Sequence, residues 1–499
     1  MFWIGKTQTE IISEQIAEKS TVIGEQIAFI TSVVSEFNNS EFRKYMDTAW
    51  RYYKNENDIL GDKRMIIGKG QDNKAVLMES KVLSNNRLCH NFMKKLTRQK
   101  IGYMLGKPFT LTPTKADDAK AKKLFEYCRS LYFGKDFYKF IKNVARDSIV
   151  KGMGWVHVYY DEEGNLKFMR CPPEEIIPLW RDNDHSELDA VVRQYNVEQY
   201  SSGAKKIIKY VDYYTREGVY HYVFNDNGKL VQNEAKPEIS YNFTVMQPDE
   251  NGQNQAEGVM WSKIPFIPFK YDPDEQSLLV RIKSLIDDYD KKTSGIANNI
   301  DDFPNSITVV KNYDGASKEE FVYNKNEYRT IFVQGDGDAR SLETPLNITE
   351  IDNHIQRLRE DIYEFGQGVN TADKDIRDTS GVALRFLYGD LDMDCIDWGN
   401  EVEWSIMQII WFILQDLIAR GLGDYSDVEY SVTFNTDMIV NETETIQNCF
   451  TSKGVISDKT IAANHPWTIS AEKEVEDMLE ETGDKLDLEN SYGNSGANE

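Results

Sequence analysis

Residues 347–365 read NITEIDNHIQRLREDIYEF and set apolar side chains three or four positions apart, at Ile348, Ile351, Ile355, Leu358, Ile362 and Phe365. Side chains at that spacing share one face of a helix, so the pattern predicts a helix with a narrow apolar seam. A second seam of the same kind, over residues 274–300, contains Leu278, Ile282, Leu285 and Tyr289. Narrow seams with charged flanks favour a pair of helices that packs against neighbours rather than forming a globular core.

Strand patterns lie between and before these two helices. Between them are two segments rich in strand formers, SITVVKNYD (306–314) and NEYRTIFVQ (326–334). Before them, WVHVYYDEEGNLKFMRC (155–171) predicts a hairpin with its turn at Glu163-Gly164-Asn165. Strand patterns continue from there to about residue 247. We therefore expect an α+β fold.

Helical patterns occupy both ends of the chain. They cover Thr9 to about Tyr53, about 85–106 and 115–150, whereas 61–75 has the composition of a loop. A long helical pattern runs from Ser380 to about Ala419, and Gly389 or Gly399 would provide a kink. The strand VEYSVTFN (428–435) follows, then shorter helices and an acidic tail.

The bulk composition excludes several classes of protein. The chain has 499 residues and a formal charge of −24, which argues against tight DNA binding. Its five cysteines are scattered, so neither a disulfide framework nor a zinc cluster is expected. We find no signal-peptide pattern at the N-terminus. The longest apolar run, Ile406–Leu414, is too short to span a bilayer.

No motif indicates catalysis, a metal or another cofactor. Asp390, Asp392, Asp394 and Glu401 have the ligand spacing of an EF-hand loop, but Cys395 replaces the glycine that the loop requires. On a helix these carboxylates would spread around the axis, so we interpret them as part of an acidic solvated or channel-lining helix. There is no GxSxG, no GxxxxGK[ST] and no HExxH. We therefore predict no enzymatic activity, ATP hydrolysis included.

Five segments, taken in order, resemble the portal proteins of siphophages of Gram-positive bacteria, the family typified by phage SPP1. They are AWRYYKNENDIL (49–60), NNRLCHNFMKKLTRQKIGYMLGKPF (85–109), DSIVKGMGWVHVYYDEEG (147–164), TSGVALRFLYGDLD (379–392) and IQNCFTSKGVISDKTIAANHPW (446–467). No single motif is decisive, but the ordered set covers most of the chain.

The resemblance implies a portal architecture with a mixed α/β wing. Its parts would be an N-terminal helical arm (1–60), the wing (61–273), a first stem helix (274–301), a strand-containing clip (302–346), a second stem helix (347–366), a tunnel loop (367–380), a long kinked helix with a returning wing strand (381–440), a helical crown (441–482) and a disordered acidic tail (483–499). Ile351, Ile355, Leu358 and Ile362 would then form the stem interface. Lys374 and Arg377 would be the basic residues of a loop in the DNA channel.

The resemblance also implies partners and a location. The chain would assemble with itself as a ring, a dodecamer in the virion, at the capsid portal vertex, after assembly in the host cytoplasm. It would contact the terminase large subunit, a head-completion or adaptor protein, the major capsid and scaffolding proteins, and double-stranded DNA that passes with weak non-specific contact. Two alternatives stay open: another phage head or tail structural protein, and an acidic cytoplasmic enzyme.

Overall fold

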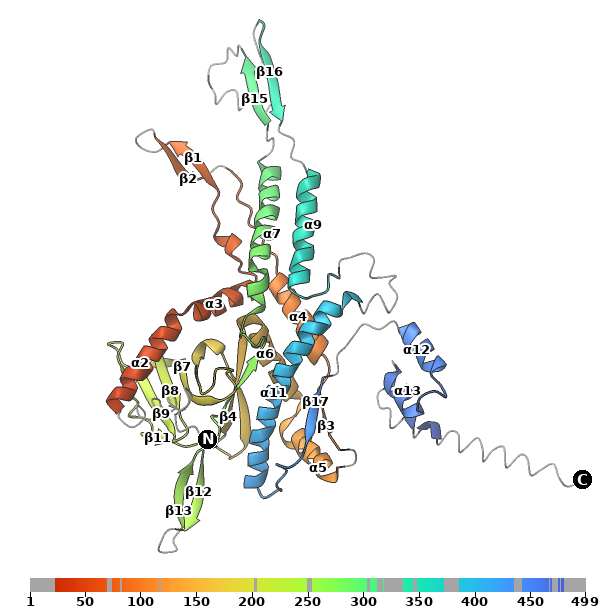
Figure 1. Ribbon diagram of the computed structural model, residues 1–499. Coiled ribbons are helices and arrows are strands. Elements are labelled where there is room, and N and C mark those ends of the chain that lie inside the picture. Colours follow the sequence, from red (N-terminus) through yellow and green to blue (C-terminus); the bar gives the residue numbers. More distant parts are fainter. Residues whose placement is uncertain are drawn as a thin grey trace, which may run out of the picture. The chain divides into compact units, whose positions relative to one another are not determined.

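The computed structural model describes residues 23–479 with gaps at 70–73, 81–82, 116–117, 202–203, 249–253, 303–305, 312–316, 318–334, 344–347, 372–385, 435–441, 466, 469–473 and 476. The chain divides into two compact units. The first comprises the chain through Gly368 together with Cys395–Asn435, and the second comprises Val369–Asp394 and the residues from Thr436 onward. Figure 1 shows the elements of both.

Two helices begin the described chain. α2 (Ile23–Asn39) and α3 (Glu41–Tyr53) are separated at Ser40, within the stretch predicted to be helical. Ser40 has an extended backbone, and its hydroxyl accepts a hydrogen bond from the Arg43 N–H at 3.1 Å. Serine is a favoured N-cap because its side chain satisfies an amide that the helix itself leaves unpaired. The prediction of helical structure up to about Tyr53 is therefore confirmed for the described residues, with a break at Ser40.

The prediction of a loop at 61–75 was also wrong. A short 3-10 turn, η1 (Asp58–Gly61), leads into an antiparallel ribbon of β1 (Met65–Lys69) and β2 (Ala75–Glu79). The glycines and polar residues of this stretch indicated a loop, but Met65–Ile67 and Val76–Met78 on either side are apolar and suit paired strands.

Helices follow the ribbon. α4 (Phe92–Leu105) leads through β3 (Thr110–Pro113) to α5 (Ala119–Tyr127), a π-turn η2 (Cys128–Tyr132) and α6 (Lys135–Lys151). α4 starts later than the predicted residue 85, because Asn91 caps it by accepting the Lys94 N–H at 3.2 Å. The residues before Asn91 are extended and pair with another helix, as described below.

Two sheets form the strand-rich part of the first unit. The predicted hairpin is confirmed as β4 (Met153–Tyr160) and β5 (Leu166–Cys171), and β14 (Phe266–Lys270) joins it in the order β14-β4-β5. The second sheet has the order β10-β9-β8-β7-β6, and β11 pairs with β9. Its strands are β6 (Ile176–Trp180), β7 (Leu188–Ser201), β8 (Ala204–Tyr214), β9 (Val219–Phe224), β10 (Leu230–Gln232) and β11 (Ile239–Ser240). A separate hairpin pairs β12 (Phe243–Pro248) with β13 (Asn254–Val259).

Strand β4 is buried on both faces. It therefore connects the main core of this unit to the second sheet, called the outer sheet below. Val156 and Val158 belong to the main core, together with α6 and the long helix α11 (Gly389–Ala419). Trp155 belongs to a second cluster that includes Val191 and Tyr214 of the outer sheet. α2 covers the other side of that sheet through Ile30 and Val34. Because side chains alternate along a strand, one apolar strand serves both clusters.

The two helices predicted from their seams are present. α7 (Leu278–Asp301) begins after Ser277, whose hydroxyl caps it, and α9 (Ile348–Phe365) begins one residue after the predicted start. Between them in the sequence, β15 (Ser306–Lys311) pairs with β16 (Asp338–Glu343). The predicted strand segment 326–334 lies outside the described residues.

The last elements include the most apolar helix of the described chain. α11 is unbroken across Gly399, and a turn at Tyr388 precedes it, next to Gly389. It is the one helix in the described ranges that is long and apolar enough to cross a membrane. Trp398, Ile406 and Ile410 on it are fully buried within the protein, which accounts for its hydropathy. β17 (Tyr430–Thr433) pairs with β3, and α12 (Glu442–Thr451) and α13 (Asp458–Asn464) follow.

Candidate functional site

The helix pair α7–α9 carries the predicted stem interface, and Figure 1 shows the two helices side by side. Leu358 and Ile362 of α9 are buried in the chain's own core together with Ile282 and Ile286 of α7. Ile351 and Ile355, nearer the start of α9, are half-buried. The seam therefore has a buried part at Leu358 and Ile362 and a half-buried part at Ile351 and Ile355, of which Ile355 still packs against the same core.

A second, polar stripe runs along α7 and holds an extended segment. The backbone N–H groups of Ser84, Asn86, Leu88 and His90 donate to Asp302 Oδ1 (2.7 Å), Asn298 Oδ1 (2.5 Å), Ser294 Oγ (2.9 Å) and Asp290 Oδ1 (3.0 Å) respectively. Partners are two apart on the extended segment and four apart around α7. Two residues of extended chain span about 6.6 Å and four residues of helix about 6 Å, so the two repeats match.

This stripe was missed in the sequence, although it had a visible signal. Asp290, Ser294, Asn298 and Asp302 are short polar residues at a strict spacing of four. The first three are buried, and a buried polar group needs a hydrogen-bond partner. Such a row predicts that something polar, here a peptide backbone, lies along that face of the helix.

The segment after α9 is the start of the predicted tunnel loop, and its first residues are firmly held. Lys100 of α4, which is fully buried, donates from Nζ to the Gln367 carbonyl at 2.9 Å. Arg281 of α7 donates to Gln367 Oε1 at 2.5 Å and to Asp272 Oδ2 at 2.7 Å. Gln367 itself has a φ of +47°, a conformation uncommon outside glycine. Lys374 and Arg377 lie outside the described residues.

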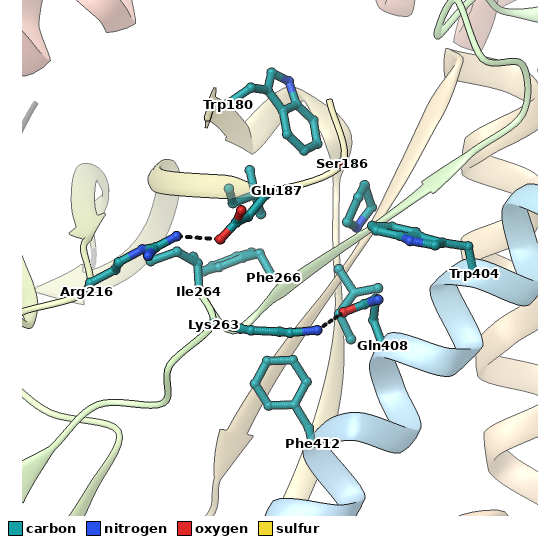
Figure 2. Close-up of a pocket in the computed structure, with 13 residues that line it drawn as sticks. Trp180, Ser186, Glu187, Arg216, Lys263, Ile264, Phe266, Trp404, Gln408 and Phe412 are labelled. Atoms are coloured by element: carbon teal, nitrogen blue, oxygen red, sulfur yellow. Dashed lines mark hydrogen bonds and ion pairs between the residues drawn. The ribbon is translucent and has the colours of Figure 1, made fainter. Parts of the chain in front are cut away.

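A pocket of about 210 Å³ lies between the two sheets and α11 (Figure 2). Its walls include Trp180, Phe266 and Phe412, and Lys263 Nζ donates to Gln408 Oε1 at 2.6 Å across its mouth. Ser186, the hydroxyl residue of the lining, donates to Asp182 Oδ2 at 2.9 Å. The same Asp182 side chain accepts the N–H groups of Ser186 and Glu187. That pattern closes a turn, so Ser186 has a structural partner rather than a catalytic base.

One cluster has the connectivity of a hydrolase triad. His221 contacts Asp212 Oδ1 through Nδ1 at 2.6 Å and Ser240 Oγ through Nε2 at 2.9 Å. The three residues lie on neighbouring strands, with Asp212 and His221 directly paired between β8 and β9. Burial works to raise the pKa of Asp212, but His221 and Lys236 outweigh it and leave that pKa below its ordinary value.

The burial of this cluster speaks for a structural role. Asp212 and His221 are buried, and the Lys236 ammonium lies 3.4 Å from His221 Nδ1, the nitrogen that faces the carboxylate. In a hydrolase triad the histidine takes the proton of the nucleophile and later donates it to the leaving group, so the substrate must reach both side chains. We interpret these contacts as cross-strand hydrogen bonds that satisfy buried polar groups.

The acidic residues once considered as calcium ligands all lie on α11. The helix distributes Asp390, Asp392, Asp394 and Glu401 around its axis, as the sequence indicated. Within the described residues, no group of three or more acidic, histidine or cysteine side chains is arranged to hold a metal ion.

The same helix carries three tryptophans, Trp398, Trp404 and Trp411. Trp398 is fully buried, whereas Trp404 and Trp411 are half-buried. Trp404 lines the pocket of Figure 2.

Comparison with known proteins gives one consistent result. The family described as "Phage portal protein, SPP1 Gp6-like" matches residues 36–486. The chain is 28% identical to the portal protein of Bacillus phage SPP1 over 515 residues, covering 99% of this chain and 97% of that protein. It is 29% identical to the portal protein of Clostridium phage phiCD119 over 450 residues, covering 87% of this chain and 91% of the other.

Proposed function

Because this chain belongs to the SPP1 Gp6-like family of phage portal proteins, we propose that it closes with copies of itself into a dodecameric ring around the DNA channel. Portal proteins are structural components of the virion and form the ring at a capsid vertex through which the genome is packaged and ejected. The family match over residues 36–486 carries this proposal, and it decides against another type of head or tail protein.

The parts of the ring are assigned to the observed elements as follows. α7 and α9 form the stem, β15 and β16 belong to the clip between them, and residues 367–380 form the tunnel loop. Residues 61–273 form the wing and 441–482 the crown. What supports this assignment is the order of the elements: two seamed helices enclose a strand pair, and the longest helix follows them.

The proposed mechanism is mechanical, without a catalytic step in this chain. Exposed carboxylates on α9, such as Glu360 and Glu364, would repel the phosphate backbone and keep DNA from adhering. Lys374 and Arg377, repeated in every subunit, would make weak and transient phosphate contacts. The held residue Gln367 would give each loop a fixed origin.

The proposed partners follow from the stages of head assembly. The clip would dock the terminase large subunit during packaging and later a head-completion or adaptor protein. The wing and crown would face the major capsid and scaffolding proteins, with assembly in the host cytoplasm.

Electron microscopy of the purified protein tests the ring. We expect negatively stained particles with a central hole and a single rotational symmetry. Monomers or open filaments as the sole species under all salt conditions would contradict the proposal.

The tunnel-loop assignment needs a separate test. Lys374→Ala with Arg377→Ala should leave rings intact but reduce the yield of full heads when it complements a portal-deficient phage. The matched control, Lys374→Arg with Arg377→Lys, keeps both charges and should package normally. Equal yields of full heads from both double variants would mean that these charges do not act on DNA.

A further inference from the structure

The ribbon β1–β2 exposes apolar side chains on both of its faces. Ile67 pairs directly with Leu77, and their exposed fractions are 78% and 63%. Directly paired residues lie on the same face of a sheet. On the opposite face, Met78 and Val76 are 44% and 48% exposed. The whole of β2 is exposed, although four of its five residues, AVLM, are apolar.

An isolated two-stranded ribbon is marginally stable in water, and a cluster of exposed apolar side chains marks a surface that binds another molecule. The described residues of the first unit do not cover the ribbon, because all of β2 is solvent-exposed among them. A neighbouring copy of the chain can supply that cover.

The base of the ribbon is nevertheless fixed. The Ser80 N–H donates to the Arg64 carbonyl at 2.8 Å and closes the ribbon at its open end. Arg64 pairs with Asp302 at the end of α7 at 3.1 Å, and the Ser84 N–H donates to the same carboxylate. From Ser84 onward the chain follows the polar stripe of α7. The ribbon is thus anchored to the stem at its base while its apolar faces stay open.

The ribbon is locally basic within an acidic chain. Residues 63–80 contain four basic and two acidic residues, in a protein whose formal charge is −24. Lys63 pairs with Glu79 at 2.8 Å and Arg64 pairs with Asp302, so the positive charge that a partner can meet comes from residues such as the exposed Lys74. α9 has the opposite balance, with five acidic and two basic residues. Its half-buried Ile351 lies between Glu350 and Asp352, so this part of α9 combines an open apolar side chain with negative charge.

We propose that the β1–β2 ribbon of one subunit packs on the start of α9 of the neighbouring subunit. Ile67 and Leu77 would cover Ile351 and Ile355, and Lys74 would face Glu350 and Asp352. The inference rests on the proposed ring, because a ring requires each subunit to present two different, complementary surfaces. A ribbon on one side and the half-buried part of the α9 seam on the other meet that requirement.

Cross-linking of mixed subunits tests the contact directly. Leu77→Cys subunits are mixed with Ile351→Cys subunits, assembled and oxidised. We expect a disulfide-linked dimer in the mixture and none in either variant alone, which also controls for the five native cysteines. If the mixture gives no more dimer than the single variants, while its rings assemble normally, the proposed contact is wrong.

A second experiment measures what the contact contributes. The double variant Ile67→Thr with Leu77→Thr places threonine, which suits a strand, at both positions and removes apolar surface from the ribbon. The protein concentration below which rings dissociate should rise by about tenfold or more. Ile207→Thr, an exposed residue on β8, is the matched control and should have little effect.

The outcomes separate this inference from the proposed function. Wild-type protein that never forms rings would contradict the ring itself. Wild-type and ribbon-variant rings of equal stability would contradict the ribbon contact alone. Ribbon variants that form stable rings but fail to enter heads would also contradict the ribbon contact, because the ribbon would then bind another head protein.

Discussion

At the scale of single residues, the structure places several ionisable groups where water cannot reach them. His157 on β4 stacks on Phe266, with ring centroids 4.4 Å apart, and meets Tyr214 edge-on. Burial lowers the pKa of His157 to about 3, and the nearby Arg193 acts in the same direction. This histidine therefore stays neutral at any pH where phage heads assemble, and it behaves as an aromatic core residue.

The pKa of His157 predicts a loss of stability in acid. The unfolded chain binds a proton near pH 6.5, whereas the folded chain does not until about pH 3. Above pH 6.5 neither state is protonated, and below it the free energy of unfolding falls by about 1.4 kcal/mol per pH unit. His157→Phe should therefore gain about 2 kcal/mol relative to wild type between pH 7.5 and pH 5. Urea unfolding at the two pH values measures this gain.

The control for this prediction is a buried aromatic residue that has no ionisable group. Phe412 lies on α11 and is 1% exposed. Phe412→Leu should differ from wild type by a similar amount at both pH values. If the His157→Phe difference does not change with pH, the folded protein must admit a proton at His157 well above pH 3.

At the scale of elements, apolar periodicity predicted the helices that bury a single apolar face. It missed the extended segment whose hydrogen-bond partners lie far away in the sequence. The apolar seams predicted the boundaries of α7 and α9 to within a few residues. The start of α4 was predicted too early, because Leu88 continues the apolar spacing of Phe92 and Leu96 although it lies in the extended segment on α7. Nothing local to residues 84–90 shows that their amides are satisfied by side chains some 200 positions away.

The candidate site was predictable to a similar degree. The seam residues of α9 were found, but their division into a buried and a half-buried part depends on where α7 lies. The β1–β2 ribbon was predicted to be a loop, because the short strands flank a glycine-rich polar stretch. Which subunit surfaces meet is a property of the assembly, and the pattern of one chain does not contain it.

The division of the α9 seam predicts two different outcomes for the same substitution. Leu358→Asp puts a carboxylate into the core of the chain and should cost several kcal/mol of monomer stability. Ile355→Asp lies in the half-buried part and should cost the monomer about 1 kcal/mol or less, yet it should weaken the ring. Urea unfolding of the dissociated subunit measures the first effect, and sedimentation measures the second.

A matched control replaces an exposed residue of the same helix. Gln356→Asp adds the same charge to α9 at an exposed position. It should leave monomer stability nearly unchanged and affect the ring less than Ile355→Asp does. If Ile355→Asp forms rings as stable as those of Gln356→Asp, the half-buried part of the seam is not a subunit contact.

At the scale of the whole molecule, the main physical difficulty is charge. Each subunit carries −24, and a ring brings many such subunits together. Opposite charges at a local contact, such as the ribbon on α9, contribute about 0.2–1 kcal/mol for each exposed pair. Repulsion between whole subunits acts over a longer range and involves many more charges, so it outweighs these pairs at low ionic strength.

This balance predicts that salt favours assembly. The screening length falls from about 30 Å at 0.01 M salt to about 10 Å at 0.1 M, so added NaCl suppresses repulsion between subunits before it weakens short contacts. The fraction of protein in rings, measured by sedimentation at fixed protein concentration, should rise from 0.01 to 0.2 M NaCl. Magnesium chloride at equal ionic strength should act at least as strongly, because divalent cations associate more closely with carboxylates. Sucrose of matched osmolality, which screens nothing, is the control for excluded volume. A ring fraction that is constant or falls over this range would show that local ion pairs, and not the net charge of the subunits, limit assembly.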